Sequence, residues 1–491
     1  MRPRLEVLDP KLVERILGEA FRLLMEPGVR VRDAEVAESL ASSGARIAEG
    51  VAHIPEAVAR KALATTPREF FLHDRAGRRV VHYGGDDVHF DPGSCCLHVL
   101  DAESGEHRAS QSADLVRLVQ VAETLPQYAA QSTAVVCGDV PREMGDFYRL
   151  FLVLWYSEKP IVTGAFGVEN LGLMIEMLAA DTAGPEALRK KPRAVFDVCP
   201  SPPLNWSEFG ARNLVELARA GVPAEIVAMP LAGATAPVTL AGSVVQHAAE
   251  CLSGITIHQL AAPGAPVVWG GAPAIFDMRT GNPPMGAVES AMLNLAAAQV
   301  GRSLGLPTHG YLVASDAKIA DAQAGMESGI SAVLGALAGI NMISGAGMLD
   351  FLACQSAEKL VMDAEAIASA QRLLQGIEGR TPSLAVDTFA QAGLSGDFLK
   401  LEETRKLFRS EQHLPSEVTD REPLEGWQEG GAQDTFARAR KRVAKLLADY
   451  ARPALGSEVE RELRRLVESK ARAAGLERLP GIESSGDRII G

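Results

Sequence analysis

The 491-residue sequence predicts an α/β fold, a TIM (β/α)8 barrel with mostly helical N- and C-terminal extensions. Three observations support this prediction. Eight short apolar runs alternate with helical patterns along the chain, which favours a barrel over an open sheet. The runs are apolar on both faces, as strands covered by an outer ring of helices must be. Several of them end in charged or aromatic residues, and α/β barrels bind ligands at these strand ends.

The expected strands follow one another at regular spacing. They are 88–100, 127–137, 160–166, 194–200, 224–230, 265–272, 307–315 and 340–347. Helical periodicity is expected between them at 113–124, 142–157, 168–180, 206–220, 238–260, 287–304 and 318–338. The first run, VHFDPGSCCLHVL, could instead form a hairpin ahead of the barrel, so the strand count is open by one.

The segments that flank these runs look helical. Residues 11–25 suit an amphipathic helix that ends at Pro27. After Phe351 the chain becomes helical and charged, which predicts solvated helices packed around the outside. We therefore expect an N-terminal extension over 1–85, a barrel core over 86–351 and a C-terminal helical extension over 352–491, packed on the barrel.

Composition excludes several classes of protein. The net charge of −13 disfavours a nucleic-acid partner. The N-terminus lacks the apolar core of a signal peptide, and no apolar run is long enough for a membrane span. The six cysteines form no CxxC pair and no structural-zinc spacing, so free thiols in the reducing cytoplasm are expected. Cys95, Cys96 and His98 are too close together to complete a metal site, and we expect no tightly bound metal.

The loops resemble those of the trimethylamine methyltransferase (MttB-like) family. The stretches that carry the resemblance are PLAGATAPVTLAGSVVQHAAE (230–250), GAPVVWGGAPAIFDMRTGNPPMGAVESAMLN (264–294), SDAKIADAQAGMES (315–328) and GWQEGGAQDTFARA (426–439). CLHVLDAESGEHRAS (96–110) and EKPIVTGAFGVENL (158–171) also fit. The resemblance extends from about Leu8 to about Leu466.

This resemblance implies a TIM-barrel methyltransferase that moves a methyl group from a methylated amine to the cobalt of a corrinoid (cobalamin) held by a cognate corrinoid protein. The founding branch uses trimethylamine and the encoded residue pyrrolysine. Only standard residues occur here, so the chain is more similar to the non-pyrrolysine branch, whose characterised members act on quaternary amines such as glycine betaine. The family also implies a homo-oligomer.

Transfer from a quaternary nitrogen needs positioning more than proton transfer, because the amine leaves as a neutral molecule. Aromatic faces bind a quaternary ammonium through cation–π contacts. The chain has few aromatic residues, so those near strand ends are candidates for substrate binding, although each could pack between barrel and helices instead. The candidates are Phe166, Trp206, Trp269, Phe276 and Tyr311.

A betaine also carries a carboxylate, for which Arg279, His309 or backbone N–H groups in 233–237 and 270–274 could serve as anchors. Arg279 could equally pair with Asp277 or Glu289. We expect His309, Asp321 and Gln323 to be catalytic, with Asp316 and Glu289 among the substrate-binding residues. We further expect Trp269, His309, Tyr311 and Gln323 to share one cavity, with Phe166 and Arg279 on its rim. A capping role for Ser315 or Asp316 is the alternative.

Two other functions remain open from the sequence. A TIM-barrel lyase or aldolase would need Lys318 or Lys359 inside the lumen with a lowered pKa. A non-catalytic barrel that binds betaine-like ligands would keep the pocket and lack the methyl transfer.

Overall fold

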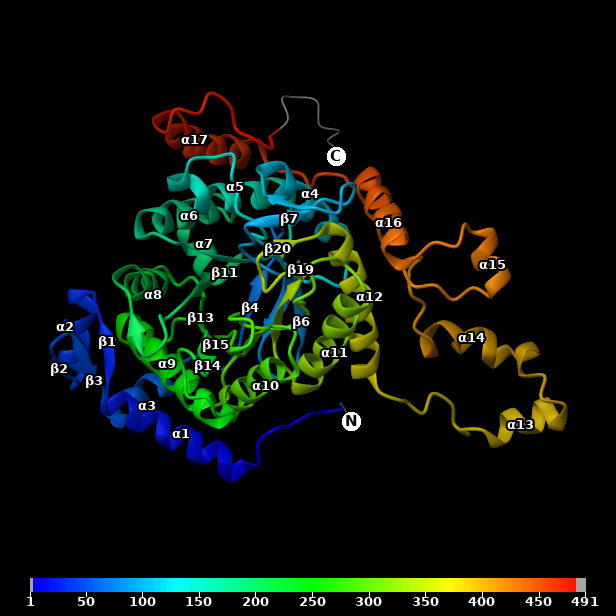
Figure 1. The fold of residues 1–491 in the computed structure, drawn as a ribbon, viewed down its shortest axis with the longest axis horizontal. Coiled ribbons are helices and arrows are strands. Elements are labelled where there is room, and N and C mark those ends of the chain that lie inside the picture. The colour runs from blue at the N-terminus through cyan, green and yellow to red at the C-terminus, as the bar shows by residue number, and fades with distance from the viewer. Residues whose placement is uncertain (1–2, 483–491) are drawn as a thin grey trace.

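The computed structural model describes residues 3–482, and eight parallel strands form a closed barrel at its centre (Figure 1). Five of these strands pair in the order β15-β13-β11-β10-β9 and three in the order β17-β18-β6. Two backbone hydrogen bonds join these sheets: Trp269 N–H donates to Pro307 O, and Ala129 N–H donates to Phe90 O. The TIM-barrel prediction is confirmed. The strands are β6 (His89–Pro92), β9 (Gln131–Ser132), β10 (Ile161–Gly164), β11 (Ala194–Val198), β13 (Ala224–Ala228), β15 (Val267–Gly271), β17 (His309–Tyr311) and β18 (Met342–Ala346).

Every expected run contains a barrel strand, and the first run contains more than one element. Its beginning forms β6 in the barrel. Its end forms β7 (His98–Leu100), which pairs antiparallel with β8 (His107–Ala109) above the barrel. The same small sheet includes β19 (Met348–Leu349) and β20 (Cys354–Gln355). The run therefore supplies both a barrel strand, β6, and one strand of a hairpin outside the barrel, β7.

An outer ring of helices alternates with the strands. Its members are α4 (Ser112–Thr124), α5 (Gly145–Tyr156), α6 (Val168–Asp181), α8 (Glu208–Ala220), α9 (Leu240–Ala261), α10 (Val288–Ser303), α11 (Ala322–Ala338) and α12 (Ala357–Gln375). A short helix, α7 (Pro185–Lys190), follows α6. Side chains alternate between the two faces of each strand, so every second one points toward the helices. Ile226 of β13, for example, packs outward on α9, where a Cβ added at Gly254 would lie 2.7 Å from Ile226 Cδ1.

The N-terminal extension covers α9. Helices α1 (Pro10–Met25), α2 (Ala34–Ser43) and α3 (Glu56–Thr65) all contact it. The strands β1 (Val29–Val31), β2 (Arg46–Ala48) and β3 (Val51–His53) form a small sheet with β12 (Asn205–Trp206). Because α9 is covered on both sides, its sequence tolerates almost continuous burial, with Glu250 as its single charged residue.

A hairpin of β4 (Phe70–His73) and β5 (Arg79–Tyr83) packs on one end of the barrel. Its residues Leu72, Val81 and Tyr83 form a hydrophobic cluster with side chains from the barrel strands, namely Ala130, Val162, Val195, Val268 and Met342. These strand residues lie near the beginnings of their strands. The hairpin therefore seals the amino end of the lumen, and ligands must enter from the carboxyl end.

The C-terminal part divides into packed and protruding segments. Helix α16 (Thr435–Asp449) packs on α4 and α12, and α17 (Ser457–Ala473) packs on α5 and α6. Between α12 and α16 the chain leaves the body and carries α13 (Val386–Ala392), α14 (Glu402–Glu411) and α15 (Leu424–Glu429) (Figure 1). The division at 85/86 and 351/352 stays a prediction. Within residues 3–482, no helix has the length and apolarity needed to cross a membrane.

Candidate active site

Three carboxyl groups meet a histidine in the barrel lumen. Glu225 lies on β13 and His309 on β17, and their side chains approach to 2.8 Å between Oε1 and Nδ1. Strand β15 stands between β13 and β17, so this contact must run across the inside of the barrel. The Ser344 hydroxyl lies 3.0 Å from His309 Nε2 and donates to Asp91 Oδ1 at 2.6 Å. These contacts form one continuous polar network, which we call the lumen network.

The sealing hairpin takes part in the lumen network. Tyr83 donates its hydroxyl to Glu225 Oε2 at 3.2 Å. Asp197, on β11, faces Glu225 from the neighbouring strand. Within residues 3–482, Asp91 Oδ2, Asp197 Oδ1 and Glu225 Oε1 are buried without a hydrogen-bond partner. Buried polar atoms are nearly always paired in folded proteins, so these oxygens indicate a site for a donor or a cation.

Burial sets the protonation of this network. It raises the pKa of Glu225 to about 8 and lowers the pKa of His309 to about 4. Burial also raises the pKa of Asp91 and of Asp197 well above the usual range for a carboxyl group. The protein alone therefore holds neutral imidazole and largely protonated carboxyl groups at neutral pH. A cation placed among these carboxyl groups would favour their ionised form, so the network can act as a counter-ion that appears on binding.

The mouth of the barrel carries a cation and an aromatic ring. Arg149 of α5 donates from Nη1 to Cys95 Sγ at 3.0 Å and to Thr133 O at 3.1 Å. Its guanidinium lies 5.3 Å from the ring centre of Phe166, which is 61% exposed. Cys199, which follows β11, is also exposed. Arg149 is itself buried, and its Nη2 lies 3.7 Å from Asp146 Oδ1, so its charge is paired at this end of the lumen. The depth of the lumen, in contrast, holds three carboxyl groups and no cationic side chain among the residues of the lumen network.

Tyr311 links the mouth to the depth. It lies two residues after His309 on the same strand face, and the two rings meet edge to face at 5.3 Å. Two positions later Val313 has a φ of 61°, which is strained for a β-branched residue. The chain therefore turns sharply just beyond Tyr311, and the surrounding structure must hold that turn.

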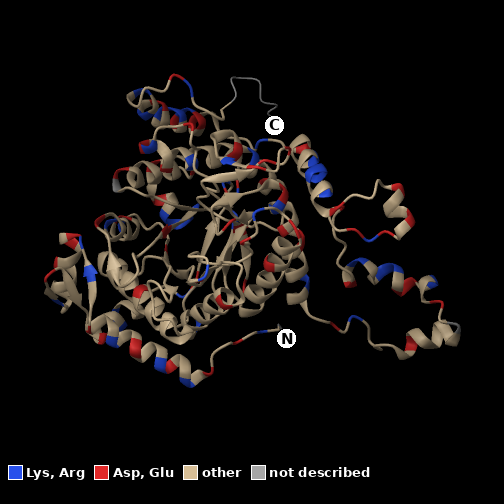
Figure 2. Ribbon diagram, viewed as in Figure 1, with Lys and Arg blue, Asp and Glu red and all other residues tan. Residues whose placement is uncertain are grey.

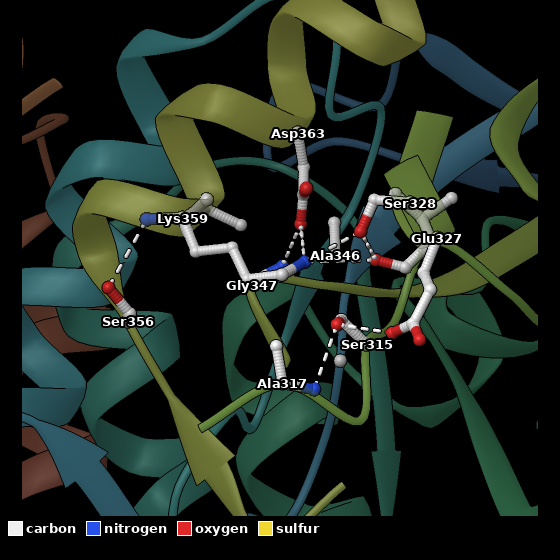
Figure 3. Close-up of polar contacts among 12 residues, drawn as sticks. Ser315, Ala317, Glu327, Ser328, Ala346, Gly347, Ser356, Lys359 and Asp363 are labelled. Carbon is white, nitrogen blue, oxygen red and sulfur yellow. Dashed lines mark hydrogen bonds and ion pairs between the residues drawn. The ribbon is translucent and has the colours of Figure 1, made fainter. Parts of the chain in front are cut away.

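A buried lysine, Lys359, holds this turn. Figure 3 shows its side chain among Ser328, Asp363 and their neighbours. Lys359 Nζ donates to Val313 O at 3.3 Å, to Ser328 Oγ at 2.8 Å and to Asp363 Oδ2 at 2.6 Å. Asp363 also accepts from the Gly347 N–H. Lys359 thus has a structural place at the end of β17, and its amine is occupied on three sides. Lys318 lies at the surface, 3.3 Å from Asp350 and over the Phe351 ring. Neither lysine enters the lumen as imine chemistry would require.

Two tryptophans predicted to bind substrate lie outside the lumen. Trp269 projects from β15 into the helix layer, where its Nε1 donates to Ala297 O of α10 at 2.9 Å. Trp206 donates to Ser253 of α9 at 2.8 Å. Both rings are buried. Both side chains project from their strands toward the helix layer and pack there, outside the lumen network, and their role in substrate binding stays a prediction.

Two charged side chains in the loop after β15 pair with each other. Arg279 pairs with Asp277 at 2.8 Å and is 88% exposed, so the structural alternative for this arginine is realised. It does not form the rim of the lumen network. Phe276 is half-buried in the same loop. Glu289 is exposed in the first turn of α10.

The acidic residues before α11 accept hydrogen bonds from backbone N–H groups. Asp321 caps α11 by accepting from the N–H groups of Gln323 and Ala324. Gln323 is exposed and donates to Glu327 at 2.9 Å. Asp316 accepts from the N–H groups of residues 285 and 286, and burial raises its pKa to about 6. Of the four residues expected to share one cavity, His309 and Tyr311 lie together in the lumen, whereas Trp269 packs in the helix layer and Gln323 is exposed on α11.

Sequence reasoning missed Asp91, Asp197, Glu225 and Tyr83. A signal for the first three was present, because each acid interrupts an otherwise apolar strand: VHFDPG, AVFDVCP and AEIVAMP. An acid inside a buried parallel strand needs a reason, since an unpaired charge there is costly. Tyr83 carried no such signal, because it reaches the lumen only through the sealing hairpin. Within the described part of the chain, no group of three or more His, Cys, Asp or Glu side chains has a geometry that could hold a metal ion.

A closed α/β barrel with buried acids and a histidine in its lumen has the architecture of a small-molecule enzyme. The family model for trimethylamine methyltransferase (MTTB) matches residues 1–475. The chain belongs to this family, and we describe it as a methyltransferase of that family.

Relatives with different substrates in their names are about equally similar. Trimethylamine methyltransferase MttB of Desulfitobacterium hafniense is 29% identical over 460 residues, covering 93% of this chain and 92% of the relative. The protein of the same name from Methanosarcina thermophila is 32% identical over 442 residues, covering 88% and 90%. Glycine betaine methyltransferase of Desulfitobacterium hafniense is 28% identical over 477 residues, covering 97% and 99%. Identity therefore does not distinguish the two substrates.

The fold also matches a solved structure. The monomethylamine methyltransferase of Methanosarcina barkeri superposes with a TM-score of 0.52 at 12% identity, covering 90% of this chain and 89% of that chain. At this identity the likeness concerns the fold alone.

Proposed function

We propose that this chain transfers a methyl group from a quaternary amine of the glycine betaine type to the Co(I) of a corrinoid carried by a cognate protein. The observation that carries the proposal is the lumen network, which is rich in carboxyl groups and in which, within the described residues, Asp91 Oδ2, Asp197 Oδ1 and Glu225 Oε1 are buried without a hydrogen-bond partner. Such a site suits a cation. Tyr311 and Tyr83 border the same network and offer aromatic surface to a quaternary ammonium group.

The chemistry needs no proton at the leaving group. The cobalt electron pair forms the Co–C bond, the C–N bond breaks, and its electron pair stays on nitrogen as a neutral tertiary amine. The residues of this chain would position the C–N bond toward the mouth and exclude water. The positive charge on nitrogen diminishes toward the transition state. Because the network must release a proton to solvent when the cation binds, the cost of that release keeps the ground state from being bound too strongly.

The second end of a betaine is an anion, and Arg149 supports its recognition. Arg149 lies at the mouth beside Cys95 and Phe166 and shares its charge with Asp146 at 3.7 Å. The sequence-predicted anchor Arg279 lies in a surface loop, paired with Asp277 at 2.8 Å. A guanidinium is well suited to a carboxylate. A substrate with a cationic head in the lumen and a carboxylate at Arg149 would match the polarity of the site from end to end.

Trimethylamine fits this proposal less well. It offers no carboxylate to Arg149, and the chain consists of standard residues only. Unless it is first protonated or otherwise activated, its methyl transfer would have to expel an amide-like anion. A quaternary amine leaves without such help.

The test is incubation of the protein with cob(I)alamin and one amine at a time, followed by absorbance for methylcobalamin. We expect methylcobalamin and dimethylglycine from glycine betaine. Product from trimethylamine but from no betaine would overturn the substrate, and no product from any amine while betaine still binds would indicate a binding protein.

A matched pair of variants tests the anchor. Arg149→Gln should raise KM for glycine betaine by about tenfold to a hundredfold, the range expected for a lost charge-assisted hydrogen bond. It should change activity toward tetramethylammonium, which has no carboxylate, much less. Arg279→Gln is the control and should change neither. Equal losses for both substrates in Arg149→Gln would argue against a carboxylate anchor.

A further inference from the structure

The segment from residue 377 to residue 414, which we call the arm, extends away from the barrel and has almost no core of its own (Figure 1). It contains α13 and α14, and neither helix has a buried side chain. The chain returns to the body at Ser416 and Thr419, both of which contact Glu365 of α12. The arm is therefore anchored at both ends and uncovered between them.

The composition of the arm is that of a segment that becomes buried. Its large apolar side chains are exposed to a degree that is unusual for a soluble surface. They are Ile377, Leu384, Val386, Phe389, Leu394, Leu399, Phe408 and Leu414. Phe389 and Phe398 already pack edge to face at 5.2 Å, so the arm has local order. Disordered segments lack such residues.

The whole chain exposes more surface than a monomer of its size should. Its accessible surface is 21906 Å², whereas a monomeric protein of 52.1 kDa is expected to expose about 17,500 Å². The excess is about 4,400 Å² per chain, so two copies that buried all of it would cover about 8,800 Å² in total, at the upper end of or beyond what permanent subunit interfaces bury. A permanent partner therefore accounts for the excess better than a transient one.

A second apolar surface lies on the same side of the molecule. On α10 the exposed residues Val288 and Met292 are four positions apart, and on the adjoining α11 so are Met326 and Ile330. We call these four residues the α10–α11 face. Apart from Glu327, which bonds to Ser315, α11 has no charged residue. The solvent-facing side of an outer barrel helix normally carries charged residues, so a helix that lacks them does not have the usual surface of one exposed to water.

We propose that the arm of one copy packs on the α10–α11 face of a second copy, and that the second arm does the reverse. The arm leaves the body from α12, which packs on α11, so the two surfaces adjoin on one chain. A two-fold axis beside them brings each arm to the other copy's face, which gives a closed and self-complementary interface. Charges of both signs along the arm also suit a second copy better than a strongly charged partner (Figure 2).

The full-length protein tests this by light scattering coupled to size exclusion. Wild type should have a mass of at least two copies of 52.1 kDa. The double variant Leu394→Glu/Leu399→Glu should have the mass of one copy. Leu394 is fully exposed and Leu399 is 83% exposed, so these changes remove no contact within the chain. Circular dichroism should show an unchanged fold.

A second variant tests the receiving surface. Ile330→Glu, at a residue that is 51% exposed, should also give single copies. The control is Val238→Glu, at a residue that is 68% exposed and precedes α9, and it should leave the mass unchanged.

Mixing gives the sharpest result. The arm variant keeps an intact α10–α11 face, and the face variant keeps an intact arm, so an equimolar mixture should regain a species of two copies through one contact. A single-copy wild type at micromolar concentration would overturn the proposal. So would an arm variant that keeps the wild-type mass, or two single-copy variants that do not combine.

Discussion

Two buried sets of ionisable side chains in this barrel differ in their balance of charge. In the lumen network, Asp91, Asp197 and Glu225 face a single neutral histidine, and burial raises the pKa of all three carboxyl groups. At the C-terminal end of α6, Asp181 lies between two arginines, at 2.8 Å from Arg75 and 2.7 Å from Arg193.

The pKa values follow this balance. Burial alone would raise the pKa of Asp181, but Arg193 and Arg75 lower it below its usual value. The same residue type at the same burial thus remains ionised beside two cations and takes up a proton among other acids. The balanced set ties α6 to β11 with matched opposite charges, and its remaining unpartnered atoms among the described residues, Arg75 Nη1 and Arg193 Nη2, are donors on groups whose charge Asp181 already balances. Within residues 3–482, the acidic set has unpartnered acceptors and no cation to balance them. The difference separates a structural ion pair from a ligand site.

The largest effect should come from the balanced set. Asp181→Asn leaves two buried guanidinium groups without their counter-ion, which should lower the free energy of unfolding by about 3–5 kcal/mol. Urea denaturation monitored by circular dichroism measures this loss. Activity per folded molecule should remain at the wild-type level, because Asp181 does not contact the lumen network.

The control for this variant is Asp277→Asn. Its partner Arg279 is almost fully in water, so the loss should stay below about 1 kcal/mol. If Asp181→Asn were no more harmful than this control, the balanced set would not be the structural unit described above.

Sequence periodicity was sufficient to predict the barrel because burial on both faces leaves a direct trace in apolar runs. Every expected run contains a barrel strand, and the helix expected over 168–180 is found at Val168–Asp181. The protruding arm was not predicted. Helical periodicity in 386–411 is the same whether a helix packs on its own body or on another surface, so sequence cannot distinguish the two.

The site was predicted less completely than the fold. His309 and Tyr311 were placed together because alternation puts them on one strand face. The same alternation places Trp269 opposite the lumen, but a tryptophan at a strand end gives no sign of which face is inside. Asp91, Asp197 and Glu225 come from three separate strands. Their proximity is a property of barrel closure, which no local pattern records.

Glu225→Gln, in the lumen network, should lower activity without lowering stability, the opposite of what we expect for Asp181→Asn. Glutamine keeps the shape and the contact to Tyr83 but cannot become a counter-ion. A quaternary ammonium group has no N–H to donate, so the variant loses the charge attraction between the carboxylate and the cation. We expect a loss of about tenfold to 150-fold in kcat/KM for glycine betaine, which corresponds to about 1.4–3 kcal/mol. The free energy of unfolding should not fall.

The control here is Glu250→Gln. Glu250 is a buried acid of α9, with a pKa that burial raises to about 7, but it bonds to Leu204 N–H and Gln246 away from the lumen. Its activity should match wild type. Equal losses in both variants would mean that burial of an acid, rather than its place in the lumen, matters.

The dependence of stability on pH should be smaller. The pKa of Glu225 is about 8 in the folded state and 4.5 as its ordinary value. The native state therefore holds a proton that the unfolded state releases, so this stabilisation is complete below pH 4.5 and is lost as pH rises through 8. Between pH 6 and pH 8 the loss is at most about 2.7 kcal/mol. Urea curves of wild type and Glu225→Gln should diverge over this window, and parallel curves would show that Glu225 is already ionised at pH 6.

The smallest effect should come from Trp269→Phe, which tests whether this indole belongs to the wall of the barrel or to the site. The indole N–H donates to Ala297 O, and the ring lies against Gly301, where a Cβ would be 2.5 Å away. Phenylalanine keeps most of the buried ring but leaves that carbonyl without its donor, which should cost about 1 kcal/mol of stability. Because the ring points away from the lumen network, KM for glycine betaine should stay within about twofold of wild type. Tyr311→Leu is the contrasting change, since it removes an aromatic face beside His309, and it should raise KM by about twofold to thirtyfold through the lost cation–π contact. A KM in Trp269→Phe that rises as much as in Tyr311→Leu would place the indole in contact with substrate and contradict the division between wall and lumen.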